Sequence, residues 1–160
     1  LPYLGLCYGM QLAAVEFARH VLGHKDAHTV ECDSKSKNLI INVNPNQAEN
    51  IKQGRYGGTM RLGAYDCVLS ANSLARRLYD ADKISERHRH RYEFDNKYKE
   101  EMEKNGLLIT GINPQTNLAE IVELKKHPFF MGVQFHPEFE SRFLQPHPLF
   151  VGLIKAALKK

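Results

Sequence analysis

The sequence has 160 residues, of which 42% are hydrophobic and 25% charged, and its formal net charge is +4. This length suits one domain that can bury its own core, and the composition is typical of globular proteins rather than of disordered chains. No apolar run approaches the roughly 18 residues that a membrane span needs, and no signal peptide is recognised, so no membrane association is expected. Three cysteines, which form no disulfide framework, favour a reducing compartment and predict a cytoplasmic location.

Helices and strands are expected to interleave along the chain. Apolar and small residues recur at helical spacing from Met10 to Val21, and Gly23 ends that helix. Ser73 can cap a short helix, and Pro148 can begin the last one. In chain order, the expected elements are strand 3–6, helix 10–21, loop 24–37, strand 39–43, turn 44–46, strand 64–69, helix 74–79, strand 84–94, helix 97–104, strands 107–110, 119–124 and 129–135, and helix 149–158. This order predicts an α/β layered domain.

The basic residues concentrate in one predicted strand. Its alternation places His88 and His90 on one face and the arginines of the segment 87–91 on the other. We expect no nucleic-acid partner, because no array of aromatic side chains accompanies the arginines. A His-x-His metal pair lacks further ligands at suitable spacing, so packing or hydrogen bonding of the two imidazoles is the favoured interpretation.

A candidate nucleophile stands between the first strand and the first helix, in the segment Gly5-Leu6-Cys7-Tyr8-Gly9. The pattern G-x-C-x-G is the thiol form of the nucleophile elbow, in which glycines allow a tight turn. Cys7 would lie at a helix N-terminus, where the positive end of the dipole lowers the pKa of a thiol. The backbone N–H of Tyr8 would face a developing oxyanion. The competing interpretation is a small residue packed at a tight turn.

A candidate base stands near the other end of the chain, in Gln134-Phe135-His136-Pro137-Glu138. Residues two apart in an extended segment project from the same face, so His136 and Glu138 can lie side by side. The carboxylate would then orient the imidazole and leave its other nitrogen for a thiol. The alternative is a surface ion pair at a strand end. Cys32 and Cys67 have no base nearby in the sequence and are interpreted as structural.

Four segments resemble the class I (triad-type) glutamine amidotransferase domain of the CTP synthases. They span residues 1–11, 58–63, 87–93 and 134–139. The elbow and the His-Pro-Glu segment are shared by class I amidotransferases in general, whereas Gly-Gly-Thr-Met-Arg-Leu-Gly and Arg-His-Arg-His-Arg-Tyr-Glu narrow the resemblance to CTP synthases. It implies a layered α/β fold with a mostly parallel central sheet.

The resemblance implies roles for individual residues. Cys7 would attack the carboxamide of L-glutamine, forming a γ-glutamyl thioester and releasing ammonia, while His136 moves the proton and Glu138 orients the imidazole. The residues expected to bind substrate are Tyr8, Gly9, Gln11, Glu31 and Arg91. The charges of the substrate agree with the roles of Glu31 and Arg91, because a carboxylate can bind the α-ammonium of glutamine and a guanidinium can bind its α-carboxylate. No metal ligand is expected.

The resemblance also implies partners outside this sequence. We expect residues 1–160 to form the C-terminal portion of the amidotransferase domain, lacking its N-terminal strands and the glycine-rich loop that completes the oxyanion hole. An amidoligase domain of the same polypeptide would use ATP and Mg²⁺ to convert UTP to CTP, so no cofactor is expected in this domain, and the full-length enzyme would form a homo-oligomer. The segment 54–63 would be an unusual loop near the amidoligase interface. The alternatives are another class I amidotransferase, a γ-glutamyl thiol hydrolase of the same fold, and a silent interaction domain.

Overall fold

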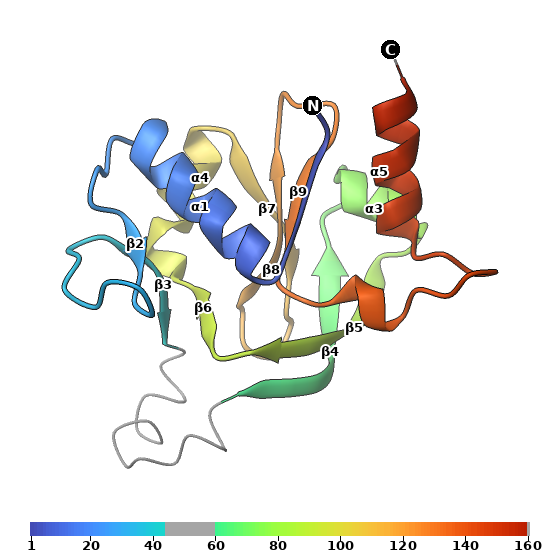
Figure 1. The fold of residues 1–160 in the computed structure, drawn as a ribbon, viewed down its shortest axis with the longest axis horizontal. Helices are drawn as coiled ribbons and strands as arrows, with labels where there is room; N and C mark the ends of the chain where they lie inside the picture. Colours follow the sequence, from blue (N-terminus) through green and yellow to red (C-terminus); the bar gives the residue numbers. More distant parts are fainter. Residues whose placement is uncertain (44–59, 160) are drawn as a thin grey trace.

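The computed structural model describes residues 1–43 and 60–159, so the expected turn at 44–46 and most of the segment 54–63 lie outside the described residues. Helices are interspersed among the strands along the described chain, as Figure 1 shows. They are β1 (Tyr3–Leu6), α1 (Tyr8–His20), β2 (His28–Thr29), β3 (Leu39–Val43), β4 (Arg61–Leu69), α3 (Leu74–Tyr79), β5 (Lys83–His90), β6 (Tyr92–Phe94), η2 (Asn96–Tyr98), α4 (Lys99–Lys104), β7 (Leu107–Ile112), β8 (Ala119–Leu124), β9 (Phe130–Val133), η3 (Pro137–Phe139) and α5 (Pro148–Leu158).

The central sheet has six strands in the order β1-β9-β8-β7-β4-β5. The α/β layered class is therefore confirmed. Parallel pairing in this sheet is nevertheless confined to β1 with β9 among the described strands, which differs from the expected mostly parallel sheet. The reason lies in the connections, because short turns join β7 to β8 and β8 to β9, and only antiparallel pairs can be joined that closely. A second, three-stranded sheet has the order β2-β3-β6.

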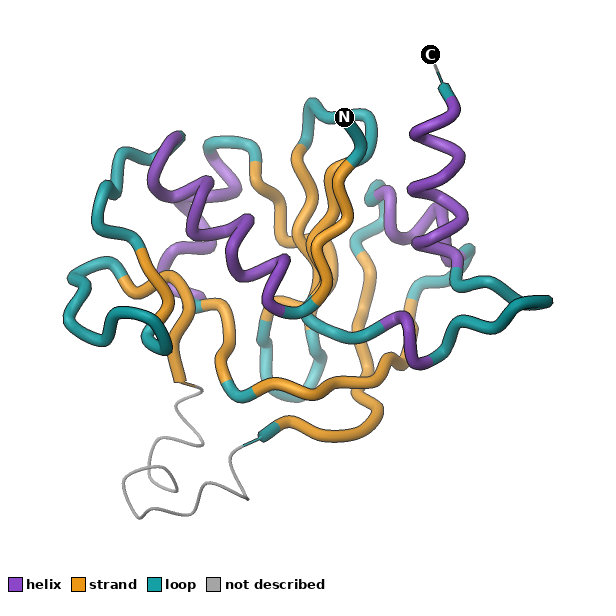
Figure 2. Tube along the Cα trace, in the orientation of Figure 1, coloured by secondary structure: helices purple, strands orange, loops and turns teal. Residues whose placement is uncertain are grey.

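Two hydrophobic cores lie on opposite faces of the central sheet. Alternation along β8 separates them, since Val122 packs in the core with α1 and α4, while Ile121 packs in the core with α3 and α5. Figure 2 shows the same arrangement, with helices on both sides of the strands. The first core holds Met10, Ala14 and Ala18 of α1, which agrees with the prediction of a buried first helix.

Local sequence signals account for several element ends. The Ser73 hydroxyl accepts a hydrogen bond from the backbone N–H of Arg76 at 3.0 Å, which caps α3 as expected. Pro148 is the first residue of α5, and the side chain of His147 caps that helix by accepting from Leu149 N–H. The short strand β2 lies within the segment predicted as loop, and it is held by pairing with β3 rather than by its own pattern.

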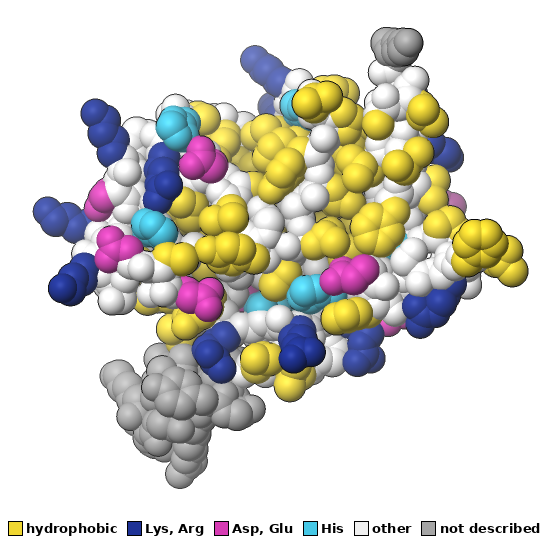
Figure 3. All heavy atoms as spheres, viewed as in Figure 1, with side chains coloured by type: hydrophobic (Ala, Val, Ile, Leu, Met, Phe, Trp, Pro, Cys, Tyr) yellow, Lys and Arg dark blue, Asp and Glu magenta, His cyan; other side chains and the backbone are white. Residues whose placement is uncertain are grey.

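The predicted strand over 84–94 is broken at Arg91, between β5 and β6. Before the break, alternation holds as expected: His88 and His90 are buried, whereas Arg87 and Arg89 are exposed. Lys and Arg side chains gather at the lower edge of the molecule, over β5 (Figure 3). Within the described part of the chain, no helix is both long and apolar enough to cross a bilayer.

Candidate functional site

Cys7 occupies a strained turn between β1 and α1. Its backbone has φ 48° and ψ −101°, a conformation that non-glycine residues adopt rarely and that costs about 1–3 kcal/mol. Its N–H donates to the carbonyl of Val133 at 2.7 Å, which holds the turn against β9. At Gly5, an added Cβ would lie 2.6 Å from the Tyr3 hydroxyl oxygen and 2.7 Å from the carbonyl carbon of Gly9. The turn therefore needs glycine at position 5.

The thiol of Cys7 is held in its protonated form. Burial raises its pKa to about 11, while hydrogen bonds from the Tyr8 backbone N–H and the Gln134 side chain oppose that rise only in part. The negative charges of Glu138 and Glu93 act in the same direction as burial. This corrects the expectation of a lowered thiol pKa at the helix N-terminus, because desolvation outweighs the two hydrogen bonds that lower it. A reaction at this sulfur therefore needs a base.

His136 is placed to be that base. Its Nδ1 lies 2.6 Å from Oε1 of Glu138, and its backbone N–H donates to the carbonyl of Arg87 at 2.8 Å. The imidazole stacks on the ring of Phe139, with centroids 5.1 Å apart and planes 20° from parallel. Its Nε2 is buried and has no hydrogen-bond partner among the described residues. Since the carboxylate accepts from Nδ1–H, Nε2 carries the lone pair and can take a proton.

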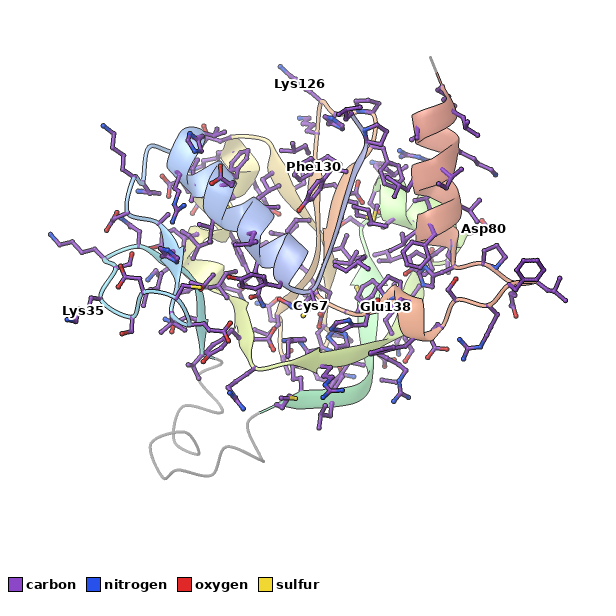
Figure 4. All side chains as sticks on the ribbon, in the orientation of Figure 1. Cys7, Lys35, Asp80, Lys126, Phe130 and Glu138 are labelled. Atoms are coloured by element: carbon purple, nitrogen blue, oxygen red, sulfur yellow. The ribbon has the colours of Figure 1, made fainter. Side chains whose placement is uncertain are left out.

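Strand pairing brings the two candidate segments together. β1 and β9 run parallel with Leu6 opposite Val133, so the residues that follow both strands emerge at one edge of the sheet. The side chain of Gln134 donates to the sulfur of Cys7, with Nε2 and Sγ 3.7 Å apart. Figure 4 shows Cys7 at the start of α1 and Glu138 on the neighbouring segment at the same end of the sheet.

Gln11 and Arg91 also lie at this edge. The Nε2 of buried Gln11 donates to the carbonyl oxygen of Tyr92 at 3.1 Å and to Oε1 of Gln134 at 3.2 Å. Arg91 is partly buried at the break between β5 and β6, next to Tyr92. The break thus contacts the first turn of α1, which begins at the elbow.

Glu31 belongs to a different segment of the chain. It is exposed in the turn after β2, beside Cys32, and the sulfur of Cys32 lies 3.3 Å from the hydroxyl of Tyr8. The structure therefore joins the turn that carries Glu31 to the elbow through Tyr8.

Gly9 is held at the other end of the elbow. Its carbonyl accepts a hydrogen bond from the hydroxyl of Tyr3 at 2.9 Å, and a Cβ added at Gly9 would lie 3.7 Å from that hydroxyl, an ordinary contact distance.

The two other cysteines differ from each other. Cys67 is fully buried in the core that faces α3 and α5, which agrees with a structural role. Cys32 is exposed, and hydrogen bonds with Thr29 and Tyr8 lower its pKa, so its interpretation as a structural residue stays a prediction. The sequence carried no signal of its exposure.

A buried charge cluster lies behind the site, and sequence reasoning missed it. The guanidinium of Arg61 donates to both carboxylate oxygens of Glu93 at 3.3 Å and to Oε1 of Glu120 at 2.7 Å. His88 Nδ1 and His90 Nε2 lie 2.9 Å apart, which confirms that the histidine pair is hydrogen-bonded. Burial and the nearby guanidinium lower the pKa of His88 to about 2 and that of His90 to about 3, so both imidazoles are neutral. Across residues 1–43 and 60–159, no group of three or more His, Cys, Asp or Glu side chains is arranged to hold a metal ion.

Comparison with known proteins identifies the family. The family model described as glutamine amidotransferase class-I matches residues 1–156. The chain belongs to the class I glutamine amidotransferase family.

Several relatives extend the comparison. The chain is 55% identical over 157 residues to a CTP synthase of Christiangramia forsetii, and 52% identical over 160 residues to one of Bdellovibrio bacteriovorus. These alignments cover 98% and 100% of this chain but 28% and 30% of the relatives, so the chain spans less than a third of their length.

Solved structures give the same result. The glutaminase domain of Trypanosoma brucei CTPS, solved with bound acivicin, matches with a TM-score of 0.91 and 34% identity, over 99% of this chain and 61% of that one. A candidate GMP synthase protein from Thermoplasma acidophilum matches with a TM-score of 0.58 and 15% identity, over 97% of this chain and 56% of that one, and shows the fold alone. The resemblance to the amidotransferase domain of CTP synthases is thereby confirmed.

Proposed function

We propose that this chain hydrolyses L-glutamine with Cys7 as nucleophile, His136 as general acid and base, and Glu138 as the group that orients the imidazole. The observation that carries the proposal is the buried Nε2 of His136, which has no partner among the described residues while Nδ1 is held 2.6 Å from Glu138. An imidazole fixed in this way has a free lone pair at the edge of the sheet where Cys7 lies.

The chemical steps follow from the protonation states. Nε2 of His136 takes the proton of the Cys7 thiol as the sulfur attacks the γ-carboxamide carbon, and the carbonyl oxygen becomes an oxyanion facing the N–H of Tyr8. Nε2 then returns the proton to the amide nitrogen, which leaves as ammonia, and a γ-glutamyl thioester remains. Water attacks the thioester and gives a proton to His136; when the C–S bond breaks, His136 returns that proton to the sulfur, so glutamate is released and the thiol is regenerated. A thiol with a raised pKa makes the base indispensable in the first step.

The amino-acid end of glutamine needs two charged partners. We assign the α-carboxylate to the guanidinium of Arg91 and the α-ammonium to the carboxylate of Glu31. Gln11 and Gly9, in the first turn of α1, complete the assigned pocket. Both charged residues belong to segments that contact the start of α1: Tyr92, next to Arg91, accepts from Gln11, and Cys32, next to Glu31, contacts Tyr8.

The longer relatives give the proposed purpose of the ammonia. The CTP synthases are more than three times as long as this chain, so we assign the remaining steps to a further part of the same polypeptide. There an amidoligase domain, with ATP and Mg²⁺, would aminate UTP to CTP in pyrimidine nucleotide synthesis. We further propose that the whole protein is a cytoplasmic homo-oligomer. Identities of 52–55% to proteins of that name favour this assignment over another amidotransferase or a γ-glutamyl hydrolase.

Acivicin provides a direct test, because it is an electrophilic amino acid and is bound by the Trypanosoma brucei domain. In the full-length protein it should modify Cys7, glutamine should protect that cysteine, and Cys32 should remain unmodified. Release of glutamate from glutamine should disappear in Cys7→Ser and fall by about 100-fold or more in His136→Ala. Equal modification of Cys7 and Cys32, or glutamine hydrolysis by Cys7→Ser, would contradict the proposal.

A further inference from the structure

Gln134 is a buried polar residue to which the proposed reaction gives no role. It directly follows β9, its side chain is fully buried, and its backbone N–H donates to the carbonyl of Glu120 at 2.8 Å. It lies two residues before His136, so the polypeptide that positions the base also positions this amide. Its Nε2 is 3.7 Å from the sulfur of Cys7, within the range of a hydrogen bond to sulfur.

The orientation of this amide is fixed by its neighbours. A carboxamide has an oxygen and a nitrogen of similar shape, and only the hydrogen-bond network tells them apart. The carbonyl of Tyr92 can only accept, so the Gln11 atom 3.1 Å away is the donating Nε2. That nitrogen also lies 3.2 Å from the Gln134 amide, which must present its oxygen there. The N–H of Gln134 is therefore left facing Cys7.

The same carbonyl is held from a second side. His90 Nδ1 lies 3.1 Å from the oxygen of Tyr92, so two side chains converge on one acceptor at the break that carries Arg91. Three successive donor–acceptor contacts thus lead from this break through Gln11 and Gln134 to the sulfur. Gln11 and Gln134 are both buried, which keeps water from competing for the amide donors that they supply.

A donor at the sulfur matters because the other charges near it are unfavourable. Glu138 and Glu93 both oppose negative charge on Cys7, and burial does the same. The backbone N–H of Tyr8 also donates to the thiol, but in the proposed reaction it donates to the substrate oxyanion instead. Gln134 is then the donor that remains on the sulfur when the thioester breaks and the electron pair returns to it.

We propose that Gln134 is a catalytic residue of this site, donating its amide N–H to the Cys7 thiolate in an orientation imposed by the Tyr92 carbonyl through Gln11. The catalytic consequence rests on the proposed glutaminase function, whereas the contact with the sulfur does not. The proposal therefore has a readout that needs no glutamine.

Alkylation of the full-length protein by iodoacetamide, followed by peptide mass spectrometry from pH 6 to pH 10, measures the thiolate of Cys7 directly. Gln134→Met keeps the length of the side chain and removes the donor, so Cys7 should react about three- to tenfold more slowly at pH 8. Cys32, in the same digest, should react at the parent rate. Gln145→Met is the matched control, since Gln145 is exposed, and it should leave both rates unchanged. A folded Gln134→Met protein whose Cys7 reacts like the parent would overturn the proposal.

Gln134→Glu supplies a second and different test. A protonated carboxyl can still donate to the sulfur, whereas a carboxylate repels the thiolate. Reactivity of Cys7 should therefore approach the parent's at pH 6 and fall progressively below it as the pH rises. A ratio to the parent that stays constant across the pH range would indicate a merely structural effect and reject the proposal. If the parent protein did not hydrolyse glutamine but the variants gave these alkylation profiles, the proposed reaction would be refuted and the Gln134 contact would remain supported.

Discussion

Replacing Arg61 with methionine should destabilise the domain, because the guanidinium is the counter-charge for two buried carboxyl groups. Arg61 is 4% exposed and contacts Glu93 at 3.3 Å and Glu120 at 2.7 Å. Removing one member of a buried ion pair costs about 3–5 kcal/mol, since the remaining charge is uncompensated. Burial raises the pKa of Glu93 to about 8 and also raises that of Glu120, so protonation of these carboxyls after the substitution offsets part of that cost. We therefore expect Arg61→Met to lower the free energy of unfolding by about 3 kcal/mol, which for a domain of this size lowers the melting temperature by roughly 6–12 °C.

The pH dependence gives the sharper test. Without Arg61, the pKa values of Glu93 and Glu120 rise further, because the guanidinium lowers both. A carboxyl with a raised pKa in the folded state binds more protons there than in the unfolded state, so stability increases as the pH falls between the two values. The penalty of Arg61→Met should thus be smaller at pH 5 than at pH 8.

Scanning calorimetry of the full-length protein, following the amidotransferase transition from pH 5 to pH 8, measures this penalty. Adding Glu93→Gln and Glu120→Gln to Arg61→Met should recover much of the lost stability at pH 8. Arg89→Met, at an exposed position of β5, is the matched control and should shift the transition little. A penalty of equal size at pH 5 and pH 8, or one below about 1 kcal/mol at pH 8, would refute the reasoning.

Two further predictions concern the elbow and the substrate. Gly5→Ala should destabilise the domain by about 1–3 kcal/mol. Tyr3→Phe should not restore the stability, because the new Cβ would still lie 2.7 Å from the backbone of Gly9. Equal melting temperatures for Tyr3→Phe and for the double variant Tyr3→Phe, Gly5→Ala would contradict this. Arg91→Ala should lower kcat/KM for glutamine by a factor that corresponds to about 2–4 kcal/mol, mainly through a higher KM, while the full-length protein keeps its ammonia-dependent amination. Glutamine kinetics equal to those of the parent would show that Arg91 is not part of the pocket.

Much of the fold could be predicted because its signals are local. The glycine pattern around Cys7 and the caps at Ser73 and Pro148 depend on neighbouring residues, and each is found where the sequence places it. The contact between His136 and Glu138 follows from their spacing of two residues. Strand direction is less local, since it depends on which strands pair. The prediction of a mostly parallel sheet was therefore wrong for the described strands, because most of them pair antiparallel.

The rest of the site depends on burial and on distant partners, which one sequence does not reveal. Arg61 looks like any surface arginine in the sequence, yet its two carboxyl partners come from strands far along the chain. The raised pKa of Cys7 results mainly from desolvation, which the short motif around the cysteine does not reveal. For Gln134, one signal was present: it shares the two-residue spacing of His136 and Glu138, and that alternation could have placed it on the same face.

The parallel pairing of β1 with β9 has a consequence for how such a domain can change over time. Backbone hydrogen bonds, which do not depend on side-chain identity, fix the separation of the segments that carry Cys7 and His136. Adjacent strands lie about 4.8 Å apart in any sheet, whatever loops connect them. Insertions and deletions in the loops between these strands can therefore leave the spacing of nucleophile and base unaltered, so the domain can acquire new contact surfaces while its chemistry stays constant.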